Sequence, residues 1–455
     1  MRRLLAALCL TLAGCMPAPG PDTASRAAVM VGPVTPLPGM KHFASAQPTA
    51  PVVSNADLAR DVLDLAFSLE SGRALETFSR FEGPITLRVT GDAPPTLGPD
   101  LAQLLHRLRT EAGIDISRVT APEANITLVG VPRAEIRRNL PQAACFVVPN
   151  ASSLPEYLRA RRSPAVSWSS VRERQRVAVF LPADAAPQEL RDCLHEEIAQ
   201  ALGPLNDLYR LPDSIFNDDN VHTVLTGYDM TVLRAFYDPA LRSGLSRAEV
   251  AARLPAVLSR VNPGGANLPA RHLPETSRDW IAAIQAALGP GATAGERQAA
   301  AARALRIAQR AGWRDHRLGF SHYAMGRMLQ GTDTEAARAE FLRADGALAQ
   351  APGTGLHRAY VAAQLAAYAV HDSRPEDALR LIGPHLETAA RHENAALLST
   401  LMLMRAEALG LEGRHSEARR VRLDSLGWAR YGFGPDWAVH AKLREIAALN
   451  PLKGS

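Results

Sequence analysis

The sequence has few lysines, few cysteines and only one long apolar run. Lys41, Lys442 and Lys453 are the only lysines among 51 basic residues, so arginine carries almost all of the positive charge. The formal net charge of +5 is a small excess for 455 residues, and no basic cluster is interleaved with aromatic side chains. A nucleic-acid-binding surface needs such a cluster. The sequence therefore predicts no nucleic-acid partner.

The motifs of several enzyme classes are also missing. The chain has no GxSxG turn for a nucleophilic serine, no GxxxxGK phosphate loop and no GxGxxG after a predicted strand. The nearest serine motif, GFSHY at 319–323, lacks the second glycine and falls in a segment with helical periodicity. The sequence therefore gives no support to a serine hydrolase, a P-loop enzyme or a dinucleotide-binding enzyme.

The one apolar run lies at the N-terminus, in MRRLLAALCLTLAGC. Two arginines, an apolar segment too short to span a bilayer and small residues before a cysteine are typical of a secretion signal. The last four residues, LAGC, resemble the bacterial lipobox, in which cleavage leaves an acylated N-terminal cysteine. We therefore predict a signal peptide over residues 1–14, lipidation of Cys15, and a location in the cell envelope, membrane-anchored and facing the periplasm. The alternative is a plain cleaved signal.

Two cysteines, Cys145 and Cys193, remain if Cys9 leaves with the signal and Cys15 carries lipid. In an oxidising compartment an isolated pair predicts a disulfide. It would join a predicted strand, AACFVV, to a predicted helix that starts near Cys193. The alternative is a pair of buried free thiols.

The composition changes along the chain and predicts its domains. Residues 15–53 are rich in Pro, Ala, Gly and Ser without an apolar period, which predicts a disordered tether. Residues 54–263 mix helical apolar spacing with four short β-rich runs, PITLRVTG, ANITLVGV, ACFVVPN and RVAVFLPA, which predicts an α+β domain. After a linker over 264–289, residues 290–450 are Ala-rich and helical in pattern, without strand signals.

The helical part is repetitive. The segments TEAARAEFLRA, PEDALRLIGPH and SEARRVRLDSL each place an acidic residue ahead of a small one, at Ala337, Ala378 and Ala418, which are 41 and 40 residues apart. Another apolar-periodic helix precedes each segment. The predicted unit is therefore a helical hairpin that buries its apolar face only against its neighbours.

These hairpins resemble tetratricopeptide repeats. Gly326, Ala337, Phe341 and Ala344 fall near the small and large positions of that family, although one residue is missing between the first two and the period is longer. The resemblance implies an all-α domain with a concave surface that binds a protein or peptide partner. The alternative is a helical cap that only packs on the first domain.

Residues 193–207, CLHEEIAQALGPLND, come close to the zinc-peptidase motif HExxHxxGxxH. Glu196, Glu197, Gln200, Gly203 and Asn206 occupy its five marked positions. Residues four apart share one face of a helix, so the motif keeps the geometry of a zinc site while its histidines are replaced.

The candidate metal ligands are therefore Glu196, Gln200, Asn206 and Asp207, and Glu197 is the catalytic base if the domain is an enzyme. Oxygen ligands suit hard ions such as calcium better than zinc, and without the ion nothing lowers the pKa of an attacking water. We interpret the site as degenerate, without catalysis or cofactor. The alternatives are a peptidase that uses a divalent metal ion with these unusual ligands, and an acidic helix with an accidental likeness.

The region downstream adds to the resemblance. SIFN at 214–217 lies where metzincins carry a tight turn beneath the metal, and GYDMTVLRAFYDPAL at 227–241 resembles their closing helix. With EExxQxxG, ND and SIFND, residues 55–263 resemble a bacterial lipoprotein family known as a domain of unknown function. The resemblance implies a zincin-like α+β fold and no established activity. The predicted function is that of an envelope lipoprotein with a degenerate peptidase-like domain and protein-binding helical repeats.

Overall fold

The computed structural model describes residues 36–44, 49–140 and 143–453. The described residues from Gly39 on belong to one compact unit, and residues 36–38, which precede it, have no regular secondary structure. The predicted signal peptide and the predicted lipidation site, Cys15, lie outside the described residues. Within those residues, no helix combines the length and the apolar character that a membrane span requires.

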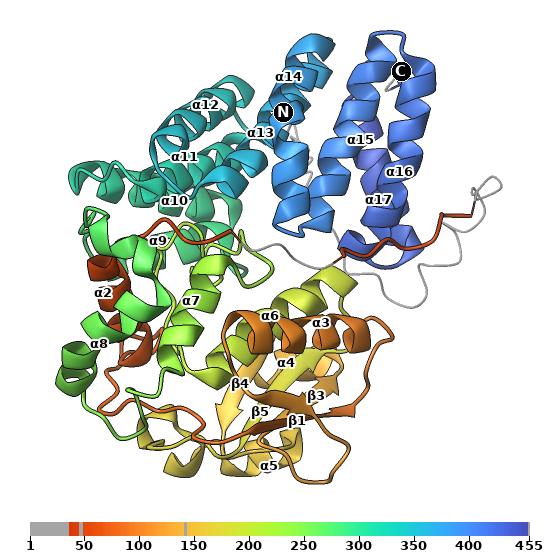
Figure 1. Cartoon of the computed structure of the whole chain (residues 1–455). Coiled ribbons are helices and arrows are strands. Elements are labelled where there is room, and N and C mark those ends of the chain that lie inside the picture. Colours follow the sequence, from red (N-terminus) through yellow and green to blue (C-terminus); the bar gives the residue numbers. More distant parts are fainter. Residues whose placement is uncertain (1–35, 45–48, 141–142, 454–455) are drawn as a thin grey trace, which may run out of the picture. The chain divides into compact units, whose positions relative to one another are not determined.

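A five-stranded mixed sheet forms the centre of the first region (Figure 1). Its strands are β1 (Ile85–Gly91), β2 (Ile116–Arg118), β3 (Ile126–Val131), β4 (Phe146–Pro149) and β5 (Val177–Pro182). They lie in the order β2-β1-β3-β5-β4. Strand β4 runs antiparallel to β5, whereas all other neighbours are parallel. Within the part of the chain that the structure describes, β4 is therefore an edge strand with β5 as its one neighbour.

Helices cover both faces of the sheet. They are α3 (Leu97–Glu111) and α6 (Pro187–Leu202) on one face, and α4 (Arg133–Asn139) and α5 (Leu154–Ala160) on the other. Strand β5 shows the alternation that this burial requires: Val177 and Val179 pack with α3 and α6, while Phe180 packs with α4 and α5. A strand buried on both faces has no polar side, and all of β5 is accordingly apolar.

Three further helices complete this region: α2 (Asn55–Ala66), α7 (Gly227–Phe236) and α8 (Arg247–Val261). Helix α7 starts with a capping box, in which Thr226 and Asp229 exchange hydrogen bonds between side chain and backbone. The carboxylate of Asp229 also accepts the backbone N–H of Ile215 at 3.1 Å. This carboxylate therefore ties the SIFN turn to the helix that follows it.

The second region is all-helical and is built from hairpins. Its helices are α9 (Arg278–Leu288), α10 (Ala294–Arg310), α11 (His316–Leu329), α12 (Thr334–Gln350), α13 (Gly355–His371), α14 (Pro375–Arg391), α15 (Ala395–Leu411), α16 (His415–Phe433) and α17 (Asp436–Ala447). Ala337 and Ala378 are fully buried, and a Cβ on Gly326 would lie only 2.8 Å from the ring of Phe341. Small residues thus let paired helices approach closely. An α+β region followed by an all-α region of helical hairpins is confirmed.

Part of the segment predicted as a tether packs on the helical region. The ring of Phe43 stacks on Trp428 of α16 with 4.5 Å between centroids, and the backbone N–H of Lys41 donates to the carbonyl of Gly427 at 3.1 Å. Val53 is buried in the core of the first region. The residues of this segment between 15 and 35 lie outside the described part of the chain.

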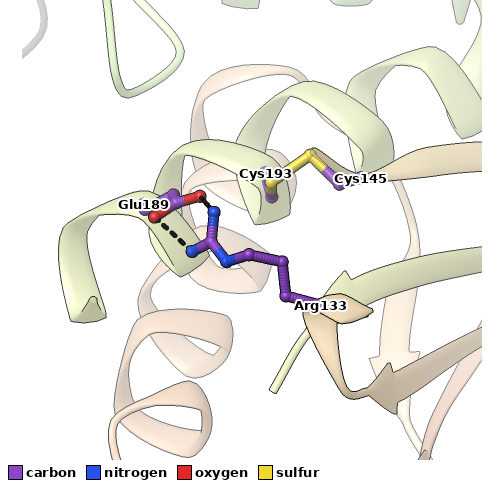
Figure 2. The surroundings of a disulfide bond; sticks show 4 residues. All are labelled: Arg133, Cys145, Glu189 and Cys193. Atoms are coloured by element: carbon purple, nitrogen blue, oxygen red, sulfur yellow. Dashed lines mark hydrogen bonds and ion pairs between the residues drawn. A yellow bond between two sulfur atoms is a disulfide. The ribbon is translucent and has the colours of Figure 1, made fainter. Parts of the chain in front are cut away.

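The predicted disulfide between Cys145 and Cys193 is present. It joins the residue that precedes β4 to the middle of α6, and Figure 2 shows a second tie nearby. There Arg133, at the start of α4, forms a two-pronged ion pair with Glu189 in the first turn of α6, at 2.6 Å for each prong. These two links fix α6 against the sheet.

Candidate functional site

Helix α6 is positioned at both ends by specific contacts. Pro187 occupies its first turn, where a missing N–H costs nothing. The helix ends at Gly203, where a Cβ would lie 2.4 Å from the ring of Phe236. The buried guanidinium of Arg174 donates to the carbonyls of Ala201 at 2.8 Å and Gly203 at 2.6 Å. Arg174 therefore pairs carbonyls that a helix end leaves free and offsets the negative end of the helix dipole.

A cleft of about 580 Å³ lies between α6 and the segment that leads into β4. Five carboxyl groups and two amides line it: Glu70, Glu196, Glu197, Asp207 and Asp218, with Gln200 and Asn220. The edge-strand wall is formed by Cys145, Phe146 and Val147, and the indole of Trp168 also faces the cleft. Its described lining contains no histidine, and its one cysteine is held in the disulfide. The cleft is therefore acidic, and the ionisable side chains that line it are all carboxyl groups, which could bind an ion only through oxygen.

Three of the four predicted metal ligands, Glu196, Gln200 and Asp207, line this cleft. Asn206 does not: its amide donates to the carbonyl of Asp64 at 3.0 Å and lines a separate cavity. Within the described part of the chain, no three imidazole, thiolate or carboxylate ligand atoms of the cleft lie within 4.8 Å of one another. The structure thus brings three of the predicted residues into one cleft, but no three of its described carboxyl groups lie close enough together to bind a single metal ion.

The carboxyl groups of the cleft hold their protons more tightly than free carboxyls do. Burial raises the pKa of Glu197, and the charges of Glu70 and Asp192 raise it further. Burial also raises the pKa values of Glu196 and Asp207. Burial raises the pKa of Glu70 too, but its hydrogen bond with Asp207 opposes that rise and adds to the rise at Asp207, as expected if Asp207 keeps the proton. Neighbouring like charges cannot all ionise readily in a buried site, so these carboxyl groups lose their protons at higher pH than free carboxyls do.

Not every polar atom of the cleft has a partner. Gln200 donates to Glu70 at 3.4 Å, and the hydroxyl of Tyr209 donates to Asp218 at 3.0 Å. The Oε2 atom of Glu197 is buried and accepts no hydrogen bond from the described residues. The neighbouring groups of the site thus leave this oxygen of Glu197 unsatisfied. A buried acceptor without a donor costs about 1–3 kcal/mol, so a ligand that brings donors would be favoured here.

His195, next to the motif, does not face the cleft. Its Nδ1 atom accepts the backbone N–H of Leu225 at 3.1 Å, and burial lowers its pKa well below the usual value. The imidazole is therefore neutral and holds the loop that leads into α7. This is a packing role.

Two residues of the cleft were not among the predicted site residues. Glu70 follows α2 and stands 126 positions before Glu196, so no local spacing pointed to it. Asp218 belongs to the run Asn217-Asp218-Asp219, in which the amide of Asn217 donates to Asp219 at 2.8 Å. The run makes a turn, as such runs commonly do, and Asp218 faces the cleft from it. The acidic run could have pointed to Asp218 as a site residue, whereas nothing in the sequence pointed to Glu70.

The chain was compared with known families, proteins and structures. Residues 55–256 match the model of a family described as a protein of unknown function, DUF2927. Comparison with curated proteins and with solved structures gives no match. The predicted domain of unknown function is thus confirmed. The DUF2927 domain contains the sheet, α6 and every residue that lines the acidic cleft.

Replacing Glu197 by Gln is expected to stabilise the protein at neutral pH by about 1–2 kcal/mol. The folded pKa of Glu197 is raised above its ordinary value of 4.5. Between these two values the folded state binds the proton more tightly than the unfolded state does, so the wild-type carboxyl loses stability as pH rises. Glutamine has no charge to bury. The gain should therefore be small at pH 4 and should grow towards pH 8.

Urea unfolding of both proteins across this pH range measures the effect. Glu189→Gln is the matched control, because Glu189 lies on the same helix but pairs with Arg133 outside the cleft. This control should show no gain that increases with pH. A Glu197→Gln protein that loses stability relative to wild type as pH rises would contradict the charge state assigned to the cleft.

Proposed function

We propose that this protein is a lipid-anchored envelope protein whose DUF2927 domain binds an extended, basic peptide segment without cleaving it. The observation that carries the proposal is the acidic cleft between α6 and the edge strand, with the unpaired Oε2 atom of Glu197 inside it. Charge complementarity favours a ligand with lysine or arginine side chains. Their N–H groups would supply the donors that Glu197 lacks.

The edge strand supports an extended conformation of the ligand. Among the described residues strand β4 pairs with β5 alone, so its other side could pair with an added strand from a ligand. Phe146 and Val147, from this strand, line the cleft directly. A peptide that pairs with β4 would thus place alternate side chains among the carboxyl groups.

The helical region supports a partner longer than the cleft. A second cavity, of about 230 Å³, is lined by Phe320, Tyr323 and Tyr360 of the helical hairpins. It shares Asn220 with the acidic cleft. We propose that the hairpins act as tetratricopeptide-like repeats and bind the part of the partner that leaves the cleft beside Asn220.

The residue types of the cleft support binding rather than hydrolysis. The position of α6 at the cleft edge, with Glu196, Glu197 and Gln200 lining the cleft, fits a zincin-like domain that has lost its imidazole ligands. Carboxylate and amide oxygens bind zinc poorly compared with imidazole and thiolate. Without such an ion, the pKa of an attacking water stays near its bulk value of about 16.

The anchor rests on the lipobox-like sequence that ends at Cys15. Two or more acyl chains make attachment to a membrane effectively stable, whereas one does not. Metabolic labelling with a fatty acid, followed by membrane fractionation of wild type and Cys15→Ala, tests this part. A labelled, membrane-bound Cys15→Ala protein would show that another residue or mechanism holds the chain there.

Fluorescence anisotropy with labelled extended peptides tests the binding function. Peptides rich in Lys and Arg should bind, and the same peptides with Glu in place of the basic residues should not. Glu197→Gln should weaken binding by about tenfold, as expected for the loss of one charge-assisted hydrogen bond, whereas Glu189→Gln should leave it unchanged. The peptide should be recovered intact after incubation. Metal-dependent cleavage that Glu197→Gln abolishes would instead identify a peptidase, and equal binding of acidic peptides would refute the charge complementarity.

A further inference from the structure

A second group of polar side chains meets outside the acidic cleft. Asp213 and His222 belong to the loop between α6 and α7, and His392 caps the C-terminus of α14 in the helical region. One ligand atom from each of these three residues lies within 4.8 Å of the other two. The rings of His222 and His392 are 5.2 Å apart between centroids.

We propose that Asp213, His222 and His392 bind one zinc ion, which joins the DUF2927 domain to the helical hairpins. Two imidazoles and one carboxylate are ligand types that zinc prefers, and three protein ligands leave a fourth position for water. Around a tetrahedral ion with bonds of about 2.0–2.2 Å, ligand atoms are separated by roughly 3.3–3.6 Å. Small side-chain rotations would bring the three groups from their present spacing to this one.

The surroundings of His222 suit a metal ligand. One of its ring nitrogens, Nε2, lies 3.0 Å from the carbonyl of Pro212, which can accept an N–H there. Such a hydrogen bond fixes the tautomer and leaves the other ring nitrogen with a free lone pair. His222 is only 4% exposed, so its orientation is set by packing.

A metal ion could reach Asp213, His222 and His392 through a cavity, and a further histidine lies close to them. A cavity of about 220 Å³ has both Asp213 and His392 in its lining, which provides a path for an ion. Another imidazole, that of His357, lies 6.2 Å from the ring of His222 and is 3% exposed. Its Nδ1 atom has no hydrogen-bond partner among the described residues. We assign no ligand role to His357.

The position of the group gives the ion a specific consequence. The loop that carries Asp213 and His222 also carries Asp207 and Asp218 of the acidic cleft. Zinc at this point would hold that loop against α14 and so stabilise the junction of the two regions. This inference does not depend on what the cleft binds.

Calorimetric titration of the chelator-treated full chain with zinc tests the proposal. Wild type should bind one ion per chain and melt at a higher temperature with zinc. His392→Gln and Asp213→Asn, which lie on different elements, should each weaken binding by at least about tenfold to 100-fold and lose the thermal shift. His385→Gln is the matched control, since His385 lies on the same helix, α14, outside the group.

Cobalt provides a spectroscopic check, because the visible absorption bands of the bound ion depend on the number and type of its ligands. These bands should be present in wild type and His385→Gln and lost in the two ligand variants. Wild type that binds neither ion would overturn the proposal, as would ligand variants that bind like wild type. Binding that Glu197→Gln abolishes would place the ion in the acidic cleft and would also overturn it, while leaving the peptide-binding proposal to its own test.

Discussion

Replacing Cys145 and Cys193 together by alanine is expected to lower the free energy of unfolding by about 4 kcal/mol. The bond closes a loop with a sequence separation of 48 residues, and the chain-entropy model gives a stabilisation of this size for such a loop. Alanine is the suitable replacement because Cys193 is only 3% exposed, and a serine hydroxyl there would add the cost of burying a polar group.

The same double variant is expected to loosen the acidic cleft. Cys145 lines the cleft next to β4, and Cys193 lies on α6, so the bond joins its two walls. Without the bond, the ion pair between Arg133 and Glu189 remains as a tie between α6 and the start of α4. Amide hydrogen exchange should therefore accelerate in β4 more than in the central strand β3.

Urea unfolding and hydrogen exchange of the double variant measure the two effects. Wild type unfolded in the presence of a reductant is the control and should lose a similar amount of stability. A loss below about 1 kcal/mol in both experiments would show that the unfolded chain gains little freedom when the loop opens. Unchanged exchange in β4 would show that packing alone holds the cleft wall.

The strands show what could be predicted from the sequence. Four β-rich runs bounded by turn residues predicted strands, and the structure places β1, β3, β4 and β5 in them. The missed strand, β2, has only three residues and forms by pairing with β1 in parallel. A segment this short has no period of its own, because its conformation is set by a neighbour that is distant in sequence.

For the cleft, too, the sequence predicted the residues placed by one helix and not those placed by contacts that are distant in sequence. Helical spacing correctly placed Glu196, Glu197 and Gln200 together, because their positions depend on one helix. The direction of Asn206 depends on a contact with the carbonyl of Asp64, which is 142 residues away, and the position of Glu70 depends on how α2 packs. Neither could be derived from spacing within the motif.

The junction between the two regions was least accessible to sequence analysis. Composition indicated an Ala-rich helical part that buries its own faces, and it gave no sign of polar contacts with the first region. The structure shows such contacts: Gln188 of α6 donates to Asn394 at 3.0 Å and accepts the backbone N–H of Ala396 at 2.9 Å. On the same helix, Arg191 forms an ion pair with Glu393. Helical periodicity reports apolar faces, so it does not reveal pairs of this kind.

Replacing Arg191 by Met is expected to lower the free energy of unfolding by about 3–5 kcal/mol, since removal of one partner leaves a buried charge uncompensated. The side chains of Arg191 and Glu393 are 1% and 4% exposed, and the guanidinium also donates to Gln103 at 2.7 Å. Burial raises the pKa of Glu393, and the charge of Arg191 opposes this rise. Without Arg191 that pKa should rise further, so the loss should be smaller at pH 5, where Glu393 is protonated more readily, than at pH 8.

The backbone conformation of Glu393 suggests variants that separate the contribution of the Arg191–Glu393 ion pair to stability from the cost of backbone strain. Glu393 follows α14 with φ of +52°, a left-handed conformation that favours glycine, and Gly413 holds the same place after α15 with φ of +77°. Glu393→Gly removes this strain and the charge together, so it should cost less than Glu393→Ala, by about 1 kcal/mol. Arg191→Met combined with Glu393→Gln should recover part of the loss of Arg191→Met, because no buried charge is then left alone. Urea unfolding of these four variants and of Glu393→Gln alone gives these differences. Strictly additive losses in the double variant would show that Arg191 and Glu393 act independently.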